Sequence, residues 1–281
     1  MTFRRFLLFL TIAGFALLGW MYWTATADPV VRETRVALPG WPSGAPPVRA
    51  VLISDLHVAG PDMPPARLER IVGQIDALRP DLVLIAGDFV GDKDVGTRTY
   101  PAAEIAAPLA RLRPRLGTYA VLGNHDHWRD AAAVRAALEG AGVAVIVNDA
   151  VRAGPLVVGG LDDDFTGRDD MRRTVHAMRR LPGAKILLSH SPDPFATLPD
   201  GIGLMLAGHT HCGQIRLPLI GAYSYESRYG ARYGCGRVDE RGRTLIVTAG
   251  LGTSVLPLRL GAVPDLWLVT IGPERRPRAA R

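Results

Sequence analysis

Residues 206–214 read LAGHTHCGQ, in which an apolar run ends at a glycine and two histidines follow one residue apart. Such histidine pairs also occur in ordinary loops, so His209 and His211 indicate a metal site only if the rest of the chain supplies partners for them. The chain has only 7 histidines. The placement of the other five therefore decides what this stretch means.

Apolar, β-rich segments alternate with amphipathic segments over most of the chain. Residues 48–54 (VRAVLIS) predict a buried strand, and residues 66–79 predict a helix because apolar side chains recur there at helical spacing. Further strands are predicted at 81–87, 118–123, 143–147, 155–160, 185–189 and 202–208, and further helices near 102–112, 130–140 and 169–180. The last third has strands but no clear helix. This pattern predicts one α/β domain whose sheet becomes more antiparallel toward the C-terminus.

Polar side chains follow five of these strands at the point where each strand ends. The segments SDLH, GD, GNHD, LLSH and GHTH supply Asp55, His57, Asp88, Asn124, His125, His190, His209 and His211. Because sites in open α/β sheets form at the carboxyl ends of strands, we expect these side chains to converge. Imidazoles, two carboxylates and an amide oxygen suit divalent Mn, Fe, Zn or Co. Seven ligands are too many for one tetrahedral zinc, and they suit two ions sharing a carboxylate, an arrangement used for phosphoryl displacement.

The ordered motifs DLH, GD, GNHD, a later single histidine and GHTH resemble those of the calcineurin-like metallophosphoesterase family, over about residues 48–270. The segments GHTHCGQIRLP, SRYGARYGCG and GLGTSVLPLRLG resemble its membrane-associated bacterial branch. The resemblance implies a four-layer α/β/β/α sandwich with two mixed sheets. It also implies a phosphoester hydrolase in which a metal-bound hydroxide attacks phosphorus.

The resemblance implies a role for each strand-end residue. One metal ion would be held by Asp55, His57 and His211, the other by Asn124, His190 and His209, and Asp88 would bridge the two. His125 would protonate the leaving oxygen or stabilise charge on the phosphoryl group. The family's second motif usually has an aspartate three residues after the bridging one to orient this histidine, but Gly91 stands there. Asp92 and Asp126 are the two candidates to replace it.

The substrate is open at this stage. Relatives in the membrane-associated branch are linked to cleavage of the pyrophosphate in UDP-diacylglucosamine, a lipid A precursor, so the resemblance implies a lipid-linked phosphoester or pyrophosphate as one candidate. A nuclease or nucleotide phosphodiesterase is an alternative, and a metal-binding scaffold without catalysis is another. The presence of every inferred ligand, and of His125, argues against the scaffold.

The positive charge of the chain lies at its two ends. Of the net charge of +6, residues 1–27 contribute +2 through Arg4 and Arg5, and residues 273–281 contribute +3, which leaves about +1 for the body between them. A body this close to neutral argues against nucleic acid as a partner. The hydrophobic share of 48% and the charged share of 21% are typical of a globular protein.

An uncharged apolar run extends from Phe6 to Trp23, directly after the two arginines. It is longer than the core of a signal peptide and reaches the ~18 residues needed to span a bilayer. We predict that residues 1–27 are a single-pass membrane anchor, with the arginines inside and the catalytic domain on the extracytoplasmic side. The alternative is an exported soluble protein, cleaved near Ala27. We expect an extended linker over residues 28–47, the phosphoesterase domain over 48–272 and a basic tail over 273–281.

Three other features have more than one interpretation. Cys212 is expected to pack as a small residue in a turn, with a soft metal ligand beside the histidine pair and a disulfide with Cys235 outside the cytoplasm as the alternatives. Residues 161–170 (LDDDFTGRDD) predict an exposed turn before a helix, with lining of the site as the alternative. Residues 223–237 (YSYESRYGARYGCGR) offer arginines to a phosphate or lipid head group, or they form a solvated loop. The sequence does not predict the oligomeric state.

Overall fold

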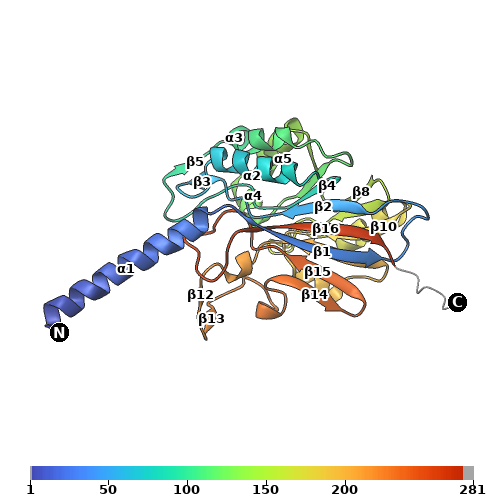
Figure 1. Ribbon diagram of the computed structural model, residues 1–281. Coiled ribbons are helices and arrows are strands. Elements are labelled where there is room, and N and C mark those ends of the chain that lie inside the picture. The colour runs from blue at the N-terminus through green and yellow to red at the C-terminus, as the bar shows by residue number, and fades with distance from the viewer. Residues whose placement is uncertain (1, 275–281) are drawn as a thin grey trace.

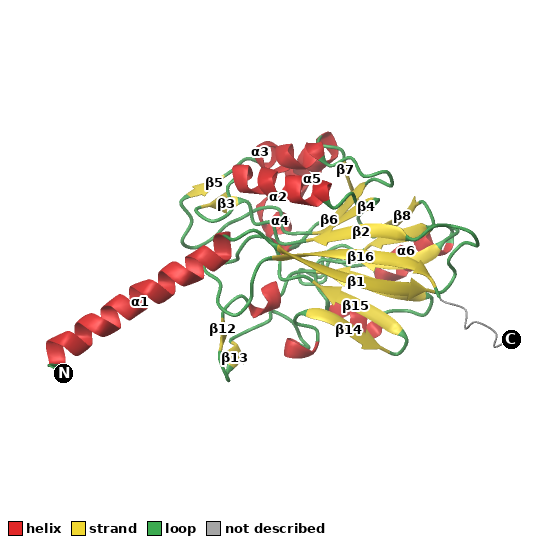
Figure 2. Ribbon diagram, viewed as in Figure 1, coloured by secondary structure: helices red, strands yellow, loops and turns green. Residues whose placement is uncertain are grey.

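The computed structural model describes residues 2–274. Two six-stranded sheets pack face to face, and helices cover both outer faces (Figures 1 and 2). Helix α1 (Phe3–Thr26) precedes them and projects from one end of the molecule (Figure 1). This confirms the predicted α/β/β/α sandwich with mixed sheets and an N-terminal hydrophobic helix.

The first sheet has the strand order β1-β16-β2-β4-β6-β7. These strands are β1 (Val30–Leu38), β16 (Asp265–Pro273), β2 (Val48–Ile53), β4 (Leu82–Ala86), β6 (Thr118–Val121) and β7 (Val143–Val145). The last four run parallel, and β16 is antiparallel to β2 and parallel to β1. Helices α2 (Pro65–Ala77), α3 (Ala102–Ala106) and α5 (Ala131–Gly140) cover its outer face.

The second sheet has the order β14-β15-β11-β10-β9-β8. These strands are β14 (Gly236–Glu240), β15 (Arg243–Val247), β11 (Ile202–Ala207), β10 (Ala184–Leu188), β9 (Leu156–Gly160) and β8 (Asp149–Ala153). The four central strands are parallel and the two edge strands are antiparallel to their neighbours. Helix α6 (Met171–Arg179) covers the outer face.

Short elements complete the chain. Strands β3 (Ala59–Gly60) and β5 (Arg98–Thr99) form one small ribbon, and β12 (Arg216–Leu217) and β13 (Gly221–Ala222) form another. Helix α4 (Asn124–Arg129) follows β6. Single 3-10 turns occur at Ala107–Arg111, Asp193–Thr197, His211–Gly213 and Gly230–Arg232.

The core explains why the central strands read as continuous apolar runs. In β2, Val51 and Ile53 belong to the cluster under the helices, whereas Ala50 and Leu52 belong to the cluster between the two sheets. A strand covered on both faces needs apolar side chains at successive positions. The apolar runs in the sequence therefore identified the buried strands, and the candidate site residues follow the ends of these strands.

The expected linker over residues 28–47 contains a strand, which corrects that prediction. β1 pairs with β16 along its whole length, from Val30 opposite Asp265 to Leu38 opposite Pro273. Most β1 side chains are exposed or half-buried, so its sequence lacks the apolar signal of a central strand. Pairing with a strand at the far end of the chain determines its conformation. The predicted basic tail lies, from residue 275 on, outside the described residues.

Helix α1 is apolar and mostly exposed. Among residues 2–274, it is the one helix long and apolar enough to cross a membrane. Only its last turns contact the body, where Met21, Thr24 and Ala25 are buried. Three hydrogen bonds hold this end. The Arg259 backbone N–H donates to Met21 O (3.1 Å), the Tyr22 hydroxyl donates to Pro61 O (3.3 Å), and Arg67 Nη2 donates to Ala27 O (2.7 Å).

Candidate metal centre

The predicted site residues meet at one edge of the sandwich, where strands of both sheets end. Asp55 and His57 follow β2, Asp88 follows β4, Asn124 and His125 follow β6, His190 follows β10, and His209 and His211 follow β11. All except His125 are buried. The two sheets therefore each contribute side chains to a single cluster.

One group of donors comprises Asp55, His57 and His211, whose donor atoms lie within 4.8 Å of one another. Nε2 of His57 lies 3.1 Å from Nε2 of His211, which lies 3.7 Å from Oδ1 of Asp55. Two ligands at right angles around an ion, each about 2.1 Å from it, are separated by about 3.0 Å. The two imidazole nitrogens have the separation that a shared ion requires.

A second group of donors surrounds His190. Its Nε2 lies 3.0 Å from Asn124 Oδ1 and 3.1 Å from His209 Nδ1. Oδ2 of Asp88 lies between the two groups, 3.2 Å from His190 Nε2 and 3.5 Å from His57 Nε2. One carboxylate oxygen thus contacts a nitrogen of each group.

Backbone carbonyls orient three of the four imidazoles. The outward nitrogens lie opposite carbonyl oxygens, namely His57 Nδ1 at Val90 O (3.1 Å), His190 Nδ1 at Ala86 O (2.7 Å) and His209 Nε2 at Glu226 O (2.9 Å). A neutral imidazole that donates its outward N–H to a carbonyl directs the lone pair of its other nitrogen inward. In its neutral form, each of these rings therefore presents a ligand atom to the cluster.

Burial keeps three of the four imidazoles neutral. It lowers the pKa of His57 to about 3, that of His209 to about 4 and that of His211 well below its usual value. At His190 burial also opposes protonation, but the Asp88 carboxylate outweighs it and raises the pKa to about 10. Burial raises the pKa of Asp55 to about 6. The cluster thus combines neutral nitrogen donors with carboxylates that stabilise added positive charge, as a cation site requires.

The backbone at these strand ends is strained. Five of the seven ligand candidates have φ between 42° and 71°, namely Asp55, His57, Asp88, His209 and His211. Residues other than glycine seldom adopt this region, and such strain is found where the surrounding fold holds a functional side chain in place. The motif glycines make room beside them, since a Cβ at Gly123 would overlap Asp88 and one at Gly208 would overlap Asp55.

The sequence profile described as "Calcineurin-like phosphoesterase" matches residues 48–213. The chain belongs to the calcineurin-like phosphoesterase family. A "Transmembrane protein with metallophosphoesterase domain" from Danio rerio is 31% identical over 266 residues, which cover 88% of this chain and 58% of that protein. The chain thus spans less than two thirds of the length of this relative.

The chain is also similar to a bacterial protein and to a solved structure. The "Uncharacterized metallophosphoesterase YkuE" from Bacillus subtilis is 31% identical over 239 residues, covering 82% of this chain and 81% of that protein. A solved 5'-nucleotidase precursor from Thermus thermophilus has 16% identity and a TM-score of 0.47, over 80% of this chain and 55% of that one.

His125 lies beside this cluster of candidate ligands in the phosphoesterase domain, with its side chain 15% exposed. Its Nδ1 lies 2.5 Å from Asp92 Oδ1. Asp126 instead accepts four backbone N–H groups, those of Asp88, Phe89, Val90 and Gly123. Of the two candidates for orienting His125, Asp92 contacts the ring and Asp126 holds the surrounding loops. Burial lowers the pKa of His125, but the hydrogen bond to Asp92 outweighs it and raises the pKa.

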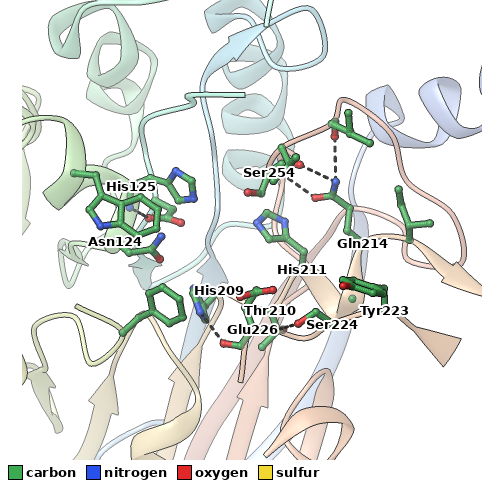
Figure 3. A pocket seen from close by; sticks show the side chains of 17 residues that line it. Asn124, His125, His209, Thr210, His211, Gln214, Tyr223, Ser224, Glu226 and Ser254 are labelled. Atoms are coloured by element: carbon green, nitrogen blue, oxygen red, sulfur yellow. Dashed lines mark hydrogen bonds between the residues drawn. The ribbon is translucent and has the colours of Figure 1, made fainter. Parts of the chain in front are cut away.

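A cleft of about 500 Å³ opens over the cluster. In Figure 3, Asn124 and His125 lie on one wall and His209 and His211 on the other. The Trp128 ring lies 4.8 Å from that of His125, and the Phe165 ring lies 4.7 Å from that of His209. Phe165 belongs to residues 161–170, which form the predicted turn before helix α6. From this segment the Phe165 side chain also lines the cleft, as the alternative interpretation expected.

Two features next to His211 support the loop that carries it. Cys212 and Cys235 form a disulfide, with Cα atoms 4.7 Å apart. Arg259 is fully buried; its Nη2 donates to Ala249 O (2.7 Å) and lies 3.5 Å from His211 Nδ1. Sequence reasoning missed Arg259 because arginine is seldom buried, and its place in GLGTSVLPLRLG was the one available signal.

Proposed function

We propose that this chain is a phosphoester hydrolase that uses two divalent metal ions. The observation that carries the proposal is the position of Asp88 Oδ2 between His57 Nε2 (3.5 Å) and His190 Nε2 (3.2 Å), with a group of donors on each side. A carboxylate shared by two donor groups suits a pair of ions rather than one.

The donors suit divalent transition metals. Asp55, His57 and His211 would hold one ion, Asn124, His190 and His209 the other, and Asp88 both. Nitrogen and oxygen donors without thiolate favour Mn, Fe, Zn or Co, since both cysteines of the chain are in the disulfide. Bound ions at such a site supply Lewis acidity toward phosphoryl oxygens and lower the pKa of water.

His125 would act as the general acid toward the leaving oxygen. The ring lies at the cleft, and contact with Asp92 favours its protonated form. A positioned imidazolium that protonates a leaving group contributes typically 10²–10⁴-fold to the rate. Trp128 and Phe165 would limit access of water around the reacting group.

We also propose that α1 anchors the catalytic domain to the membrane on its extracytoplasmic side. The exposed apolar surface of α1 suits lipid, and Arg4 and Arg5 at its start favour the cytoplasmic side. Disulfides persist in oxidising compartments, so the Cys212–Cys235 bond supports the same orientation. Cleavage near Ala27 is the alternative, but Arg67 Nη2 holds the Ala27 carbonyl and Ala25 is fully buried, which supports an uncleaved helix.

The identity of the phosphoester substrate is a separate and narrower proposal. A lipid-linked phosphoester or pyrophosphate remains a candidate for a membrane-anchored domain. UDP-diacylglucosamine is a cytoplasmic substrate, so an outward-facing domain argues against it in particular. A topology reporter fused after residue 281 tests this point, because an extracytoplasmic reporter would rule that substrate out.

The test of the proposed activity is hydrolysis of a chromogenic phosphomonoester and the matching diester by the full chain in detergent. The protein is stripped of metal and then resupplied with Mn, Zn, Fe or Mg. We expect turnover to be lost and restored, and to be absent in Asp88→Asn but unchanged in Asp76→Asn, an exposed position on α2. Full activity of Asp88→Asn would refute the proposal.

A further inference from the structure

The tip of the β12–β13 hairpin is apolar although it projects from the body. Its residues are Leu217, Pro218, Leu219, Ile220 and Gly221. Leu219 is fully exposed and Ile220 is 79% exposed. Tight turns in water favour Asn, Asp, Gly and Ser. Large apolar side chains stabilise such a tip only if something other than water covers them.

The backbone conformation of the tip is also unfavourable for the residue that occupies it. Leu219 has φ of 66°, a region that leucine seldom adopts and that asparagine or glycine would adopt with less strain. Exposure and backbone conformation therefore both disfavour leucine at this position. Residues that violate local preferences in this way are expected at functional positions.

Hydrogen bonds connect the hairpin to the docked end of α1. The Arg216 N–H donates to Leu260 O (2.7 Å), and the neighbouring Arg259 N–H donates to Met21 O of α1 (3.1 Å). In Figure 1, α1 and the hairpin project from the same end of the sandwich. The hairpin is thus held close to the helix that we propose to span the membrane.

The mouth of the cleft lies on this same surface. Tyr223, just after β13, is fully exposed and lines the cleft together with the half-exposed Val255. The Gln214 side chain holds the loop around Val255, since its Nε2 donates to Ser254 O (2.9 Å) and Leu256 O (3.1 Å) (Figure 3). Tyrosine is enriched where apolar and aqueous surroundings meet.

We propose that this apolar tip inserts into the bilayer leaflet nearest the catalytic domain, with Tyr223 and Val255 beside it at the membrane surface. The inference rests on the proposal that α1 spans the membrane. Lipid acyl chains cover the apolar side chains of the tip, and Tyr223 lies at the level of the head groups. With two points of attachment, α1 and the tip, the body takes a fixed orientation, and the cleft opens at the lipid–water interface.

The test places an environment-sensitive nitrobenzoxadiazole label on single cysteines of the full chain in phosphatidylcholine–phosphatidylglycerol vesicles. Both native cysteines are in the disulfide, so an introduced cysteine is labelled selectively in the absence of reductant. The variants are Ile220→Cys at the tip, Ile12→Cys in α1, and Ala136→Cys as the control. Ala136 is an exposed position of α5, in the helical layer over the first sheet and away from the hairpin. Circular dichroism and thermal unfolding establish that each labelled protein is folded, independently of any hydrolase activity.

We expect the labels at Ile220 and Ile12 to emit at shorter wavelength and to be quenched by nitroxide-bearing lipids, and the label at Ala136 to do neither. A lipid-quenched Ile12 with an unquenched Ile220 would refute the inference alone. An unquenched Ile12 would refute anchorage by α1 and this inference with it, whatever the hydrolase assay shows. Shielding of Ile220 that depends on protein concentration and not on the quencher lipid would assign the tip to contact with a second copy, and would also overturn the proposal.

Discussion

Removal of the Cys212–Cys235 disulfide tests how the loop carrying His211 is held. The bond closes a loop with a sequence separation of 23 residues. In the chain-entropy model, a cross-link over about 23 residues removes about 11 cal/mol/K of denatured-state entropy, or about 3.4 kcal/mol at 25 °C. For a chain of this size, that loss lowers Tm by roughly 6 °C. We therefore expect Cys212→Ala/Cys235→Ala to unfold at a clearly lower temperature than the parent chain.

The assay is thermal unfolding of the metal-free chain in detergent, with and without reductant. Reductant should lower the Tm of the parent chain to that of the double variant and should leave the double variant unchanged. Because Cys212 directly follows His211, the double variant should also bind metal more weakly. A parent chain whose Tm does not respond to reductant, while its thiols become titratable, would refute the reasoning.

Three further changes probe the chemistry and geometry of the site. His125→Ala should lower kcat by about 10²–10⁴-fold while metal content is retained, because the proposed general acid is lost; equal loss of metal and activity would contradict that role. Asp92→Asn should move the alkaline limb of the pH–rate profile to lower pH, because Asp92 raises the pKa of His125 and activity needs its protonated form; an unmoved limb would contradict it. Gly208→Ala should reduce metal content measured by elemental analysis, because the added Cβ would overlap Ser54 and Asp55; full occupancy would show that these side chains can move aside.

The sequence predicted the parts of the fold that are buried on both faces. Strands such as β4 (Leu82–Ala86) are apolar at every position, and each ends in a glycine or serine followed by a polar residue. This local pattern was sufficient to place Asp88 and the other ligand candidates at one edge. It was insufficient for β1, whose side chains are largely exposed and whose pairing depends on β16.

The details of the site that depend on tertiary contacts could not be predicted from the sequence. No local signal shows that Val90 O, Ala86 O and Glu226 O accept from the outward nitrogens of the histidines. Phe165 reaches the cleft from a segment whose composition is that of an exposed turn, and Arg259 is buried against the usual preference of arginine. Each of these features depends on which loops the two sheets bring together. The spacing of residues in a single sequence does not show which loops will meet.

In the proposed function, Asp88 joins two metal ions. The most direct test is to load the metal-stripped full chain with Mn²⁺ and to measure its metal content and its electron paramagnetic resonance spectrum on the same sample. Two ions about 3.5–4 Å apart should give two Mn per chain and an exchange-coupled spectrum. Asp88→Asn should lose the coupling, and Asp76→Asn should keep it. One ion per chain, or two ions with independent spectra in the parent protein, would contradict the account.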